Sequence, residues 1–307
     1  MRVVKISSLA SIQDLGRNTF RPFGVNESGA MDSWSLMLGN ALLCNDLNTP
    51  AIEVFMGGIE LFCDEPMTFC ISGANYEAYL NDTPIYNHYR LRAKAGDTIK
   101  LIRAKSGMIA YICVYGGIKA DYTLESFSTN LSAGFGGYKG RALKIGDEFG
   151  INSKLHLAKI GVLGIKDRKK IRIIKNSEYE LFSDEAKNAL TSCEFNISSQ
   201  SNRMGYRLQS YERLHTKEAV SIASHGVKAG TIQVPPSGEA IVLLKDAQTT
   251  GGYPKIASVI EADLGLFAQK RFNSKVQFEL VSIEEALWAK KEMISHINQV
   301  KEAAIEN

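Results

Sequence analysis

The densest group of chemically capable side chains lies in the stretch GTIQVPPSGEAIVLLKDAQTTGGYPKIA, residues 230–257. Its alternating start and its apolar run at 240–244 predict two strands, the second buried on both faces. Polar side chains follow this second strand directly, and a polar loop held by a rigid strand is how proteins usually present binding groups. The alternative is a tight hairpin turn between two core strands. The residues that we expect to line a pocket are Gln233, Asp246, Gln248, Thr249, Gly251, Gly252 and Tyr253.

A second polar cluster, QSNRMG at 200–205, is expected to face this loop. Gln200 supplies an amide, and Arg203 can hold a carboxylate through two parallel hydrogen bonds or can pair with a neighbouring acid. No carboxylate pair and no Ser/His couple stands out as catalytic in the sequence. Asp246 is therefore the nearest candidate for a general acid or base.

Asp14, Arg17 and Asp32 form a further candidate set near the N-terminus. The first two lie in a turn-rich, glycine-containing segment with many hydrogen-bond donors. Asp32 precedes a helical pattern of apolar residues, so we favour a helix N-cap over a catalytic acid at this position.

The composition is that of an ordinary globular protein, with 45% hydrophobic residues, 22% charged residues and a net charge of +3. This balance indicates neither nucleic-acid binding nor a membrane surface, and no apolar run approaches the length of a membrane span. Polar residues interrupt the N-terminal apolar run before a signal-peptide core forms, so we expect a cytoplasmic protein. Five widely spaced cysteines without a CxxC pair, and histidines without ligand spacing, predict neither disulfides nor a metal site.

Turn signals recur along the first half of the chain at the rhythm of a β-sandwich or barrel. Residues 51–63 predict a hairpin that turns at Gly57-Gly58, and residues 67–74 predict a strand that ends in a glycine turn. Residues 94–118 predict another hairpin followed by a buried strand. Nucleotide-binding, zinc-protease and esterase motifs are absent from the sequence.

A change in composition after residue 150, ending in a basic run at 166–170, indicates a domain boundary. We place an N-terminal β domain at 1–160 and a C-terminal domain at 161–307. The last segment predicts a charged amphipathic helix, whose apolar stripe we expect to dock on its own domain rather than on a partner. The stripe consists of Leu287, Trp288, Met293, Ile294 and Ile297.

Six ordered segments resemble the motifs of the biotin-dependent carboxyltransferase family. They are IQDLGR at 12–17, SGAMD at 28–32, GGYKGRALKIGD at 136–147, QSNRMGYRL at 200–208, GTIQVPPSG at 230–238 and DAQTTGGYPKIA at 246–257. Together they reach over nearly the whole chain except the C-terminal helix. The family includes the C component of the bacterial ATP-dependent 5-oxoprolinase, the proteins called allophanate hydrolase subunit 2, and the antagonist of the sporulation-kinase inhibitor.

The resemblance implies a mainly β protein of cyclophilin-like β-barrel architecture, with a few short helices and a C-terminal helix. It also implies a heteromer, in which the C component works with a cyclophilin-like B component and with a large A component that uses ATP to open 5-oxoproline to glutamate. Under this reading the chain binds no cofactor by itself and is not active alone. Side chains such as Gln233, Gln248 and Thr249, with the backbone N–H groups of Gly251 and Gly252, would donate to the carbonyl oxygen of a small amide-bearing ligand.

Two alternatives stay open under this resemblance. One is a carboxyltransferase subunit of a biotin-dependent urea or amide carboxylase, and the other is a regulatory protein that binds a kinase-inhibitor-like partner. Three positions depart from the family pattern: Phe127 and Ser132 stand where arginine is common, and Asn202 stands where aspartate is usual. The first two changes remove cations beside a glycine-rich loop, and the third removes a possible ionic partner of Arg203.

Overall fold

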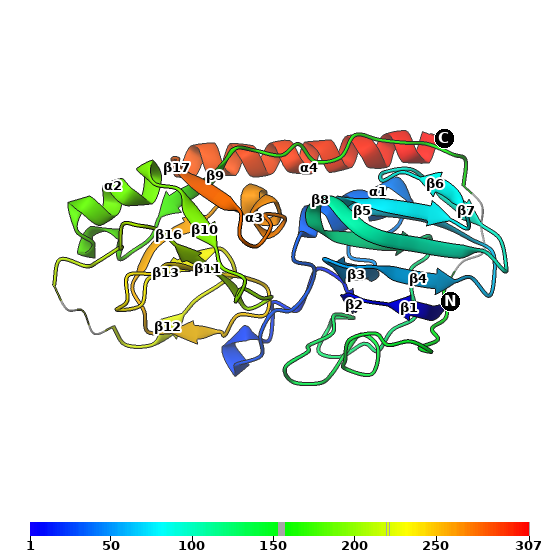
Figure 1. Ribbon diagram of the computed structural model, residues 1–307, viewed down its shortest axis with the longest axis horizontal. Helices are drawn as coiled ribbons and strands as arrows, with labels where there is room; N and C mark the ends of the chain where they lie inside the picture. The colour runs from blue at the N-terminus through cyan, green and yellow to red at the C-terminus, as the bar shows by residue number, and fades with distance from the viewer. Residues whose placement is uncertain (153–156, 219, 221, 307) are drawn as a thin grey trace. The chain divides into compact units, whose positions relative to one another are not determined.

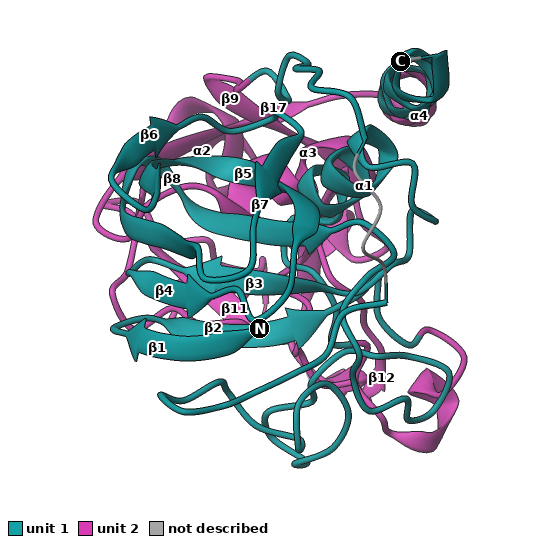
Figure 2. Ribbon diagram, turned by 90° about the vertical axis from the view of Figure 1, so that its right-hand side faces the viewer, with its two compact units in different colours: residues 1–17, 28–166, 293–307 teal, residues 18–27, 167–292 magenta. Residues whose placement is uncertain are grey.

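The computed structural model describes residues 1–152, 157–218, 220 and 222–306. The chain forms two compact units, one made of residues 1–17, 28–166 and 293–307 and the other of 18–27 and 167–292 (Figure 2). A short N-terminal segment, 18–27, thus belongs to the second unit, although both of its flanks belong to the first. The placement of folding domains at 1–160 and 161–307 stays a prediction.

The first unit is built on a sheet of eight strands, in which β1-β4-β8-β3-β2 are neighbours and β5 pairs with β6, β7 and β8 (Figure 1). Side chains such as Phe69, Ile71 and Ile112 are fully buried and form its core. The strands are β1 (Arg2–Ile6), β2 (Leu9–Gln13), β3 (Ala51–Phe55), β4 (Ile59–Phe62), β5 (Met67–Leu80), β6 (Thr83–Ile85), β7 (Leu91–Ala93) and β8 (Thr98–Val114).

The long strands β5 and β8 replace two turns that the sequence predicts. The strand expected to end near Gly73 continues through that residue, because β5 pairs with β8 on both sides of it. Gly73 has a φ of +86°, and the register shifts beside it mark a β-bulge, which absorbs the glycine without ending the strand. Residues 98–114 likewise form one strand instead of the predicted hairpin and separate strand.

The hairpin predicted at Gly57-Gly58 is also wrong in its pairing. The chain does turn there, and β3 and β4 flank the turn. These two strands do not pair with each other: β3 pairs with β2 and β8, whereas β4 pairs with β1 and β8. The length of β8 explains this, since its two halves receive the two strands in succession.

Helix α1 (Ser33–Leu42) packs on this sheet with the predicted cap. The Asp32 carboxylate accepts a hydrogen bond from the backbone N–H of Ser35 at 3.1 Å, so the expected N-cap is confirmed. Gly39 lets the helix approach the sheet closely, because a Cβ at this position would lie 2.6 Å from the Cys113 sulfur.

The second unit is a closed barrel in the strand order β10-β11-β14-β13-β16-β9-β17. Aromatic rings fill it: Tyr206 lies 5.4 Å from Phe267, and Phe195 lies 5.6 Å from Phe278, between ring centroids. The barrel strands are β9 (Lys170–Lys175), β10 (Phe195–Ile197), β11 (Gly205–Gln209), β13 (Thr231–Gln233), β14 (Ile241–Leu243), β16 (Lys255–Val259) and β17 (Lys275–Leu280). A separate ribbon pairs β12 (His225–Gly226) with β15 (Thr250–Gly251).

The remaining helices are short, apart from the last one. They are the 3-10 turns η1 (Arg21–Phe23) and η2 (Tyr179–Leu181), α2 (Asp184–Ser192), α3 (Glu261–Ala268) and α4 (Ile283–Glu306). The prediction of a mainly β protein with a barrel, a few short helices and a C-terminal helix is therefore confirmed. No helix of the described residues is long and apolar enough to cross a membrane.

The apolar stripe predicted for α4 does not form its buried face. Leu287, Trp288 and Ile294 are exposed, with 63%, 62% and 43% of their surface accessible. Only Ile297 of the predicted stripe is fully buried. The small residues of the helix complete its buried face, namely Ala289, Val300 and Ala304 with Ile297.

His88 is a partly buried titratable group from which we predict a pH dependence of stability. Its ring packs on the backbone of Gly164, and burial lowers the pKa of His88 from 6.5 to about 4. The unfolded chain therefore binds a proton that the folded chain resists, so stability is complete above pH 6.5 and is lost as the pH falls towards 4. Urea unfolding at pH 7.5 and 4.5 should show this loss, which we expect to be about 2 kcal/mol smaller in His88→Asn.

Asparagine suits this comparison because His88 has a φ of +62°, a conformation that asparagine tolerates well. Equal acid sensitivity of the wild-type and variant proteins would contradict this account of His88.

Candidate functional site

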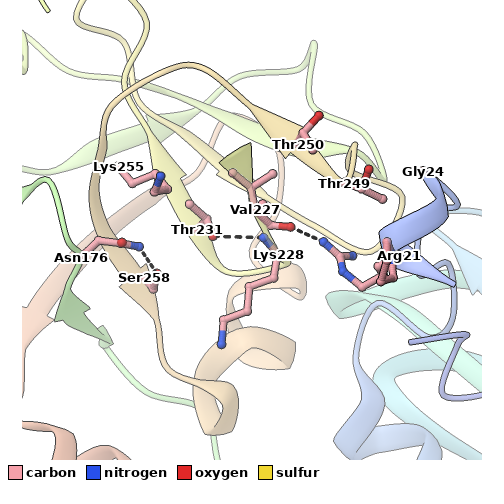
Figure 3. Close-up of a pocket in the computed structure, with 12 residues that line it drawn as sticks. Arg21, Gly24, Asn176, Val227, Lys228, Thr231, Thr249, Thr250, Lys255 and Ser258 are labelled. Atoms are coloured by element: carbon pink, nitrogen blue, oxygen red, sulfur yellow. Dashed lines mark hydrogen bonds between the residues drawn. The ribbon is translucent and has the colours of Figure 1, made fainter. Parts of the chain in front are cut away.

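A pocket of about 720 Å³ opens in the second unit, within the range of small-molecule sites (Figure 3). Barrel strands β13 and β16, the β12–β15 ribbon and the η1 turn contribute to its wall. Cations, hydroxyls and one amide supply the polar part of the lining. The lining residues are Arg21, Pro22, Gly24, Asn176, Gly226, Val227, Lys228, Thr231, Thr249, Thr250, Lys255 and Ser258.

Polar contacts hold the 18–27 segment against the barrel and bring Arg21 to the pocket. The Arg21 guanidinium donates a hydrogen bond to the carbonyl of Val227, which Figure 3 shows. Asn26 donates from Nδ2 to the carbonyl oxygen of Asp246 at 3.1 Å. The Glu27 carboxylate lies 2.5 Å from the Lys245 ammonium, with both side chains nearly buried. A segment from the N-terminal part of the sequence is thus built into the pocket wall.

Lys255 is the most unusual group of the lining, because it is a cation in a strand whose five residues are all buried. Only 4% of its surface is exposed. Its ammonium lies 3.0 Å from Oε1 of Glu178, and its backbone N–H donates to Oε2 of the same carboxylate at 2.8 Å. The geometry at Nζ is nevertheless not that of a hydrogen bond, and Nζ has no acceptor among the described atoms. An ammonium has three N–H donors, so those that are not directed at Glu178 remain available to a ligand.

The Glu178 carboxylate has polar contacts besides the one with Lys255. The Ser177 hydroxyl donates to Oε1 at 2.9 Å, and Nε2 of His225 lies 3.3 Å from the same oxygen. The other ring nitrogen of His225, Nδ1, lies 2.9 Å from the carbonyl oxygen of Ala223. Both ring nitrogens thus face oxygen acceptors, an arrangement that an imidazolium satisfies completely and a neutral ring satisfies only once.

Arg203 and Asp246 come together as the sequence suggests, but they satisfy each other. Nε and Nη2 of Arg203 lie 2.8 and 3.1 Å from the two carboxylate oxygens of Asp246. The backbone N–H of Asp246 also donates to the Arg203 carbonyl at 3.0 Å. Both side chains are buried, so this pair ties the 200–205 loop to the loop after β14. Asp246 is thus the ionic partner of Arg203, and the pair requires no acid at position 202.

Gln233 is buried beside Gly251. Its side-chain amide donates to the carbonyl oxygen of Tyr253 at 3.4 Å. A Cβ on Gly251 would lie 2.5 Å from Nε2 of Gln233, so a larger residue at this position would require the Gln233 side chain to move. Gln233, Gly251 and Tyr253 thus stabilise one turn, and the Tyr253 ring is exposed.

The other predicted residues of this group differ in position. Thr249 lines the pocket, whereas Gln200, Gln248 and Gly252 are exposed and lie outside its lining. The assignment of these residues to ligand binding stays a prediction.

The N-terminal candidates Asp14, Arg17 and Asp32 make structural contacts within the first unit. Asp14 accepts hydrogen bonds from the hydroxyls of Ser126 and Ser128 and from the backbone N–H of Phe127 at 2.7 Å. The guanidinium of Arg17 donates to the Ser128 carbonyl and lies over the Phe135 ring. Asp32 caps α1. Each of these buried side chains therefore has a structural partner, and the Phe127 that replaces a family arginine contributes through its backbone.

Sequence reasoning missed Asn176 and Lys255 in the pocket lining, and Glu178, which pairs with Lys255. One signal was present: Lys255 opens the apolar strand KIASV, and a lysine in a buried strand needs an ionic partner or a functional reason. Asn176 and Glu178 carried no such signal, because they lie far from Lys255 in the sequence. Within the described part of the chain, no three or more His, Cys, Asp or Glu residues form a group that could hold a metal ion.

Comparison with known proteins connects this geometry to a family. The carboxyltransferase domain family, subdomains A and B, matches residues 23–280. The chain belongs to this family. The match contains all the pocket-lining residues except Arg21 and Pro22.

Two full-length relatives are both the C component of a 5-oxoprolinase. That of Haemophilus influenzae is 43% identical over 300 residues, which is 97% of each chain. That of Escherichia coli is 37% identical over 302 residues, covering 98% of this chain and 97% of the relative. The crystal structure of urea carboxylase from Kluyveromyces lactis is similar with a TM-score of 0.90 and 25% identity, covering 99% of this chain and 29% of that one.

The buried ion pair provides a test of whether Asp246 acts structurally or chemically. We expect Asp246→Ala to lower the free energy of unfolding by about 3–5 kcal/mol, because it leaves the Arg203 guanidinium buried without its carboxylate. Urea unfolding measures the loss. The double variant Arg203→Met, Asp246→Leu should recover part of it, because no unpaired charge remains. A stable Asp246→Ala protein without activity would instead assign Asp246 to catalysis.

Proposed function

We propose that this chain is the C component of a bacterial ATP-dependent 5-oxoprolinase and helps convert 5-oxoproline to glutamate. One observation carries the proposal: the two relatives that are 5-oxoprolinase C components match this chain from end to end at 43% and 37% identity. The urea enzymes are more distant. The urea amidolyase of Saccharomyces cerevisiae is 29% identical, and the match covers only 16% of that protein.

The partners in this proposal are a protein like the B component and a large A component of 5-oxoprolinase, and the chain is not active alone. ATP is used by the large partner, and the chain itself holds no cofactor. The pocket of the second unit is the ligand site that this chain contributes. Its lining supports such a role, because cations and hydroxyls converge on a space large enough for a small amide-bearing acid. We place the complex in the cytoplasm.

The proposal predicts activity of a reconstituted complex. The chain, purified together with the A-like and B-like proteins of the same source, should release glutamate from 5-oxoproline only when ATP is present. Omitting this chain should abolish the release, because its pocket then no longer contributes to the site. Glutamate is measured with glutamate dehydrogenase, and undiminished release without this chain would contradict the proposal.

The second candidate is a carboxyltransferase subunit of a biotin-dependent urea or amide carboxylase. The TM-score of 0.90 to urea carboxylase over nearly the whole chain favours it. In that case activity requires a biotinylated carrier, so avidin should inhibit it. Under the leading proposal, ATP-dependent glutamate release is insensitive to avidin.

A further inference from the structure

The pocket of the second unit has an excess of positive charge. Its lining contains Arg21, Lys228 and Lys255 but no carboxylate. Glu178 balances Lys255 from behind the wall. The nearest carboxylate to Arg21 is that of Glu27, at 3.9 Å, and this carboxylate is already held by Lys245 at 2.5 Å. Arg21 is therefore only partly compensated.

Lys228 carries the charge that has no partner. Its side chain is exposed to the pocket, and no ion pair of Lys228 occurs among the described residues. In Figure 3 this side chain extends between Ser258 on one side and Arg21 on the other. An exposed ammonium in this position can contact an anion without first breaking an ion pair.

Two hydroxyl groups of the lining, those of Ser258 and Thr231, also have a proton that they can donate to a ligand. Oγ of Ser258 accepts a hydrogen bond from Nδ2 of Asn176 at 2.7 Å, and Oγ1 of Thr231 accepts from the backbone N–H of Lys228 at 3.4 Å. Since each oxygen already accepts, each hydroxyl proton can be donated to a ligand. The Lys255 ammonium, buried and without a hydrogen-bond acceptor among the described atoms, adds further N–H donors.

We propose that this pocket binds the carboxylate of a small amino-acid-like ligand, with Lys228 and Lys255 as its cationic contacts. A carboxylate brings two oxygens that accept hydrogen bonds and one negative charge, which matches a donor-rich wall with an excess cation. A neutral amide such as urea brings several N–H donors, and the lining offers few acceptors for them. Under the proposed function, on which this identification rests, the carboxylate is that of 5-oxoproline.

The two lysines have different tasks at this site. Lys255 is fixed by the strand and by Glu178, so it defines where the carboxylate sits. Lys228 supplies the charge that distinguishes an acid from a neutral lactam. Preorganised donors around a desolvated carboxylate give stronger and more specific binding than the same donors in water.

The test compares 5-oxoproline with 2-pyrrolidinone, which is the same lactam without the carboxylate. In the complete complex, Lys228→Met should raise KM for 5-oxoproline about tenfold or more, since a charge-assisted contact is lost. Turnover of 2-pyrrolidinone should not change. Lys228→Arg should retain most of the affinity for 5-oxoproline. Lys291→Met is the matched control, because it removes an exposed lysine of the same unit that does not line the pocket.

Binding to the isolated chain separates this proposal from the proposed function. Calorimetric titration with 5-oxoproline, 2-pyrrolidinone and inorganic phosphate measures the site without its partner proteins. Preference for 5-oxoproline that is lost in Lys228→Met and Lys255→Met supports the carboxylate site even if the complex releases no glutamate. Circular dichroism establishes that the Lys255→Met protein is folded. Equal binding of 5-oxoproline and 2-pyrrolidinone, or binding of phosphate alone, would overturn the proposal.

Discussion

Buried charge is the constraint on which the second unit depends. Taking a guanidinium and a carboxylate out of water costs several kcal/mol each, so Arg203 and Asp246 can be buried only as an ion pair. Their pairing joins the loop before β11 to the loop after β14. The same loop carries Lys245, whose pairing with Glu27 holds the 18–27 segment in place. Two desolvated ion pairs thus determine where the polar loops run, and the pocket forms between loops fixed in this way.

Asp14 and Lys255 are two buried charged groups with different surroundings. Asp14 in the first unit is surrounded by donors, and its oxygens accept from two hydroxyls and two backbone N–H groups. Such a saturated network stabilises the fold and leaves nothing for a ligand. Lys255 in the second unit is equally buried, yet its ammonium has no hydrogen-bond acceptor among the described atoms. Buried polar groups of native structures usually have a hydrogen-bond partner, so a ligand that accepts from Lys255 is consistent with the proposed site in the second unit.

The sequence predicted the positions of helices and strands better than it predicted which strands pair and which loops come into contact. Local signals identified the Asp32 cap and the strand at β13 correctly, because capping and alternation are properties of adjacent residues. The hairpin at Gly57-Gly58 failed because strand pairing depends on β8, some 40 residues further along the chain. The pairing of Arg203 with Asp246 could be predicted, because the cluster at 200–205 was expected to face the loop that carries Asp246. The contact of Arg21 with Val227 could not be predicted, because no local pattern shows that residues 18–27 belong to the second unit.

Family membership and specificity depend on different parts of this chain. The fold of this chain is shared with a urea carboxylase at a TM-score of 0.90, so the scaffold by itself does not select a substrate. A charged side chain in the wall can distinguish an acid from a neutral amide, because it attracts only the ligand of opposite charge. Lys228 is exposed and lies outside the barrel strands, so its replacement costs the fold little. A family that changes its substrate while keeping its barrel can therefore do so most easily at such a position.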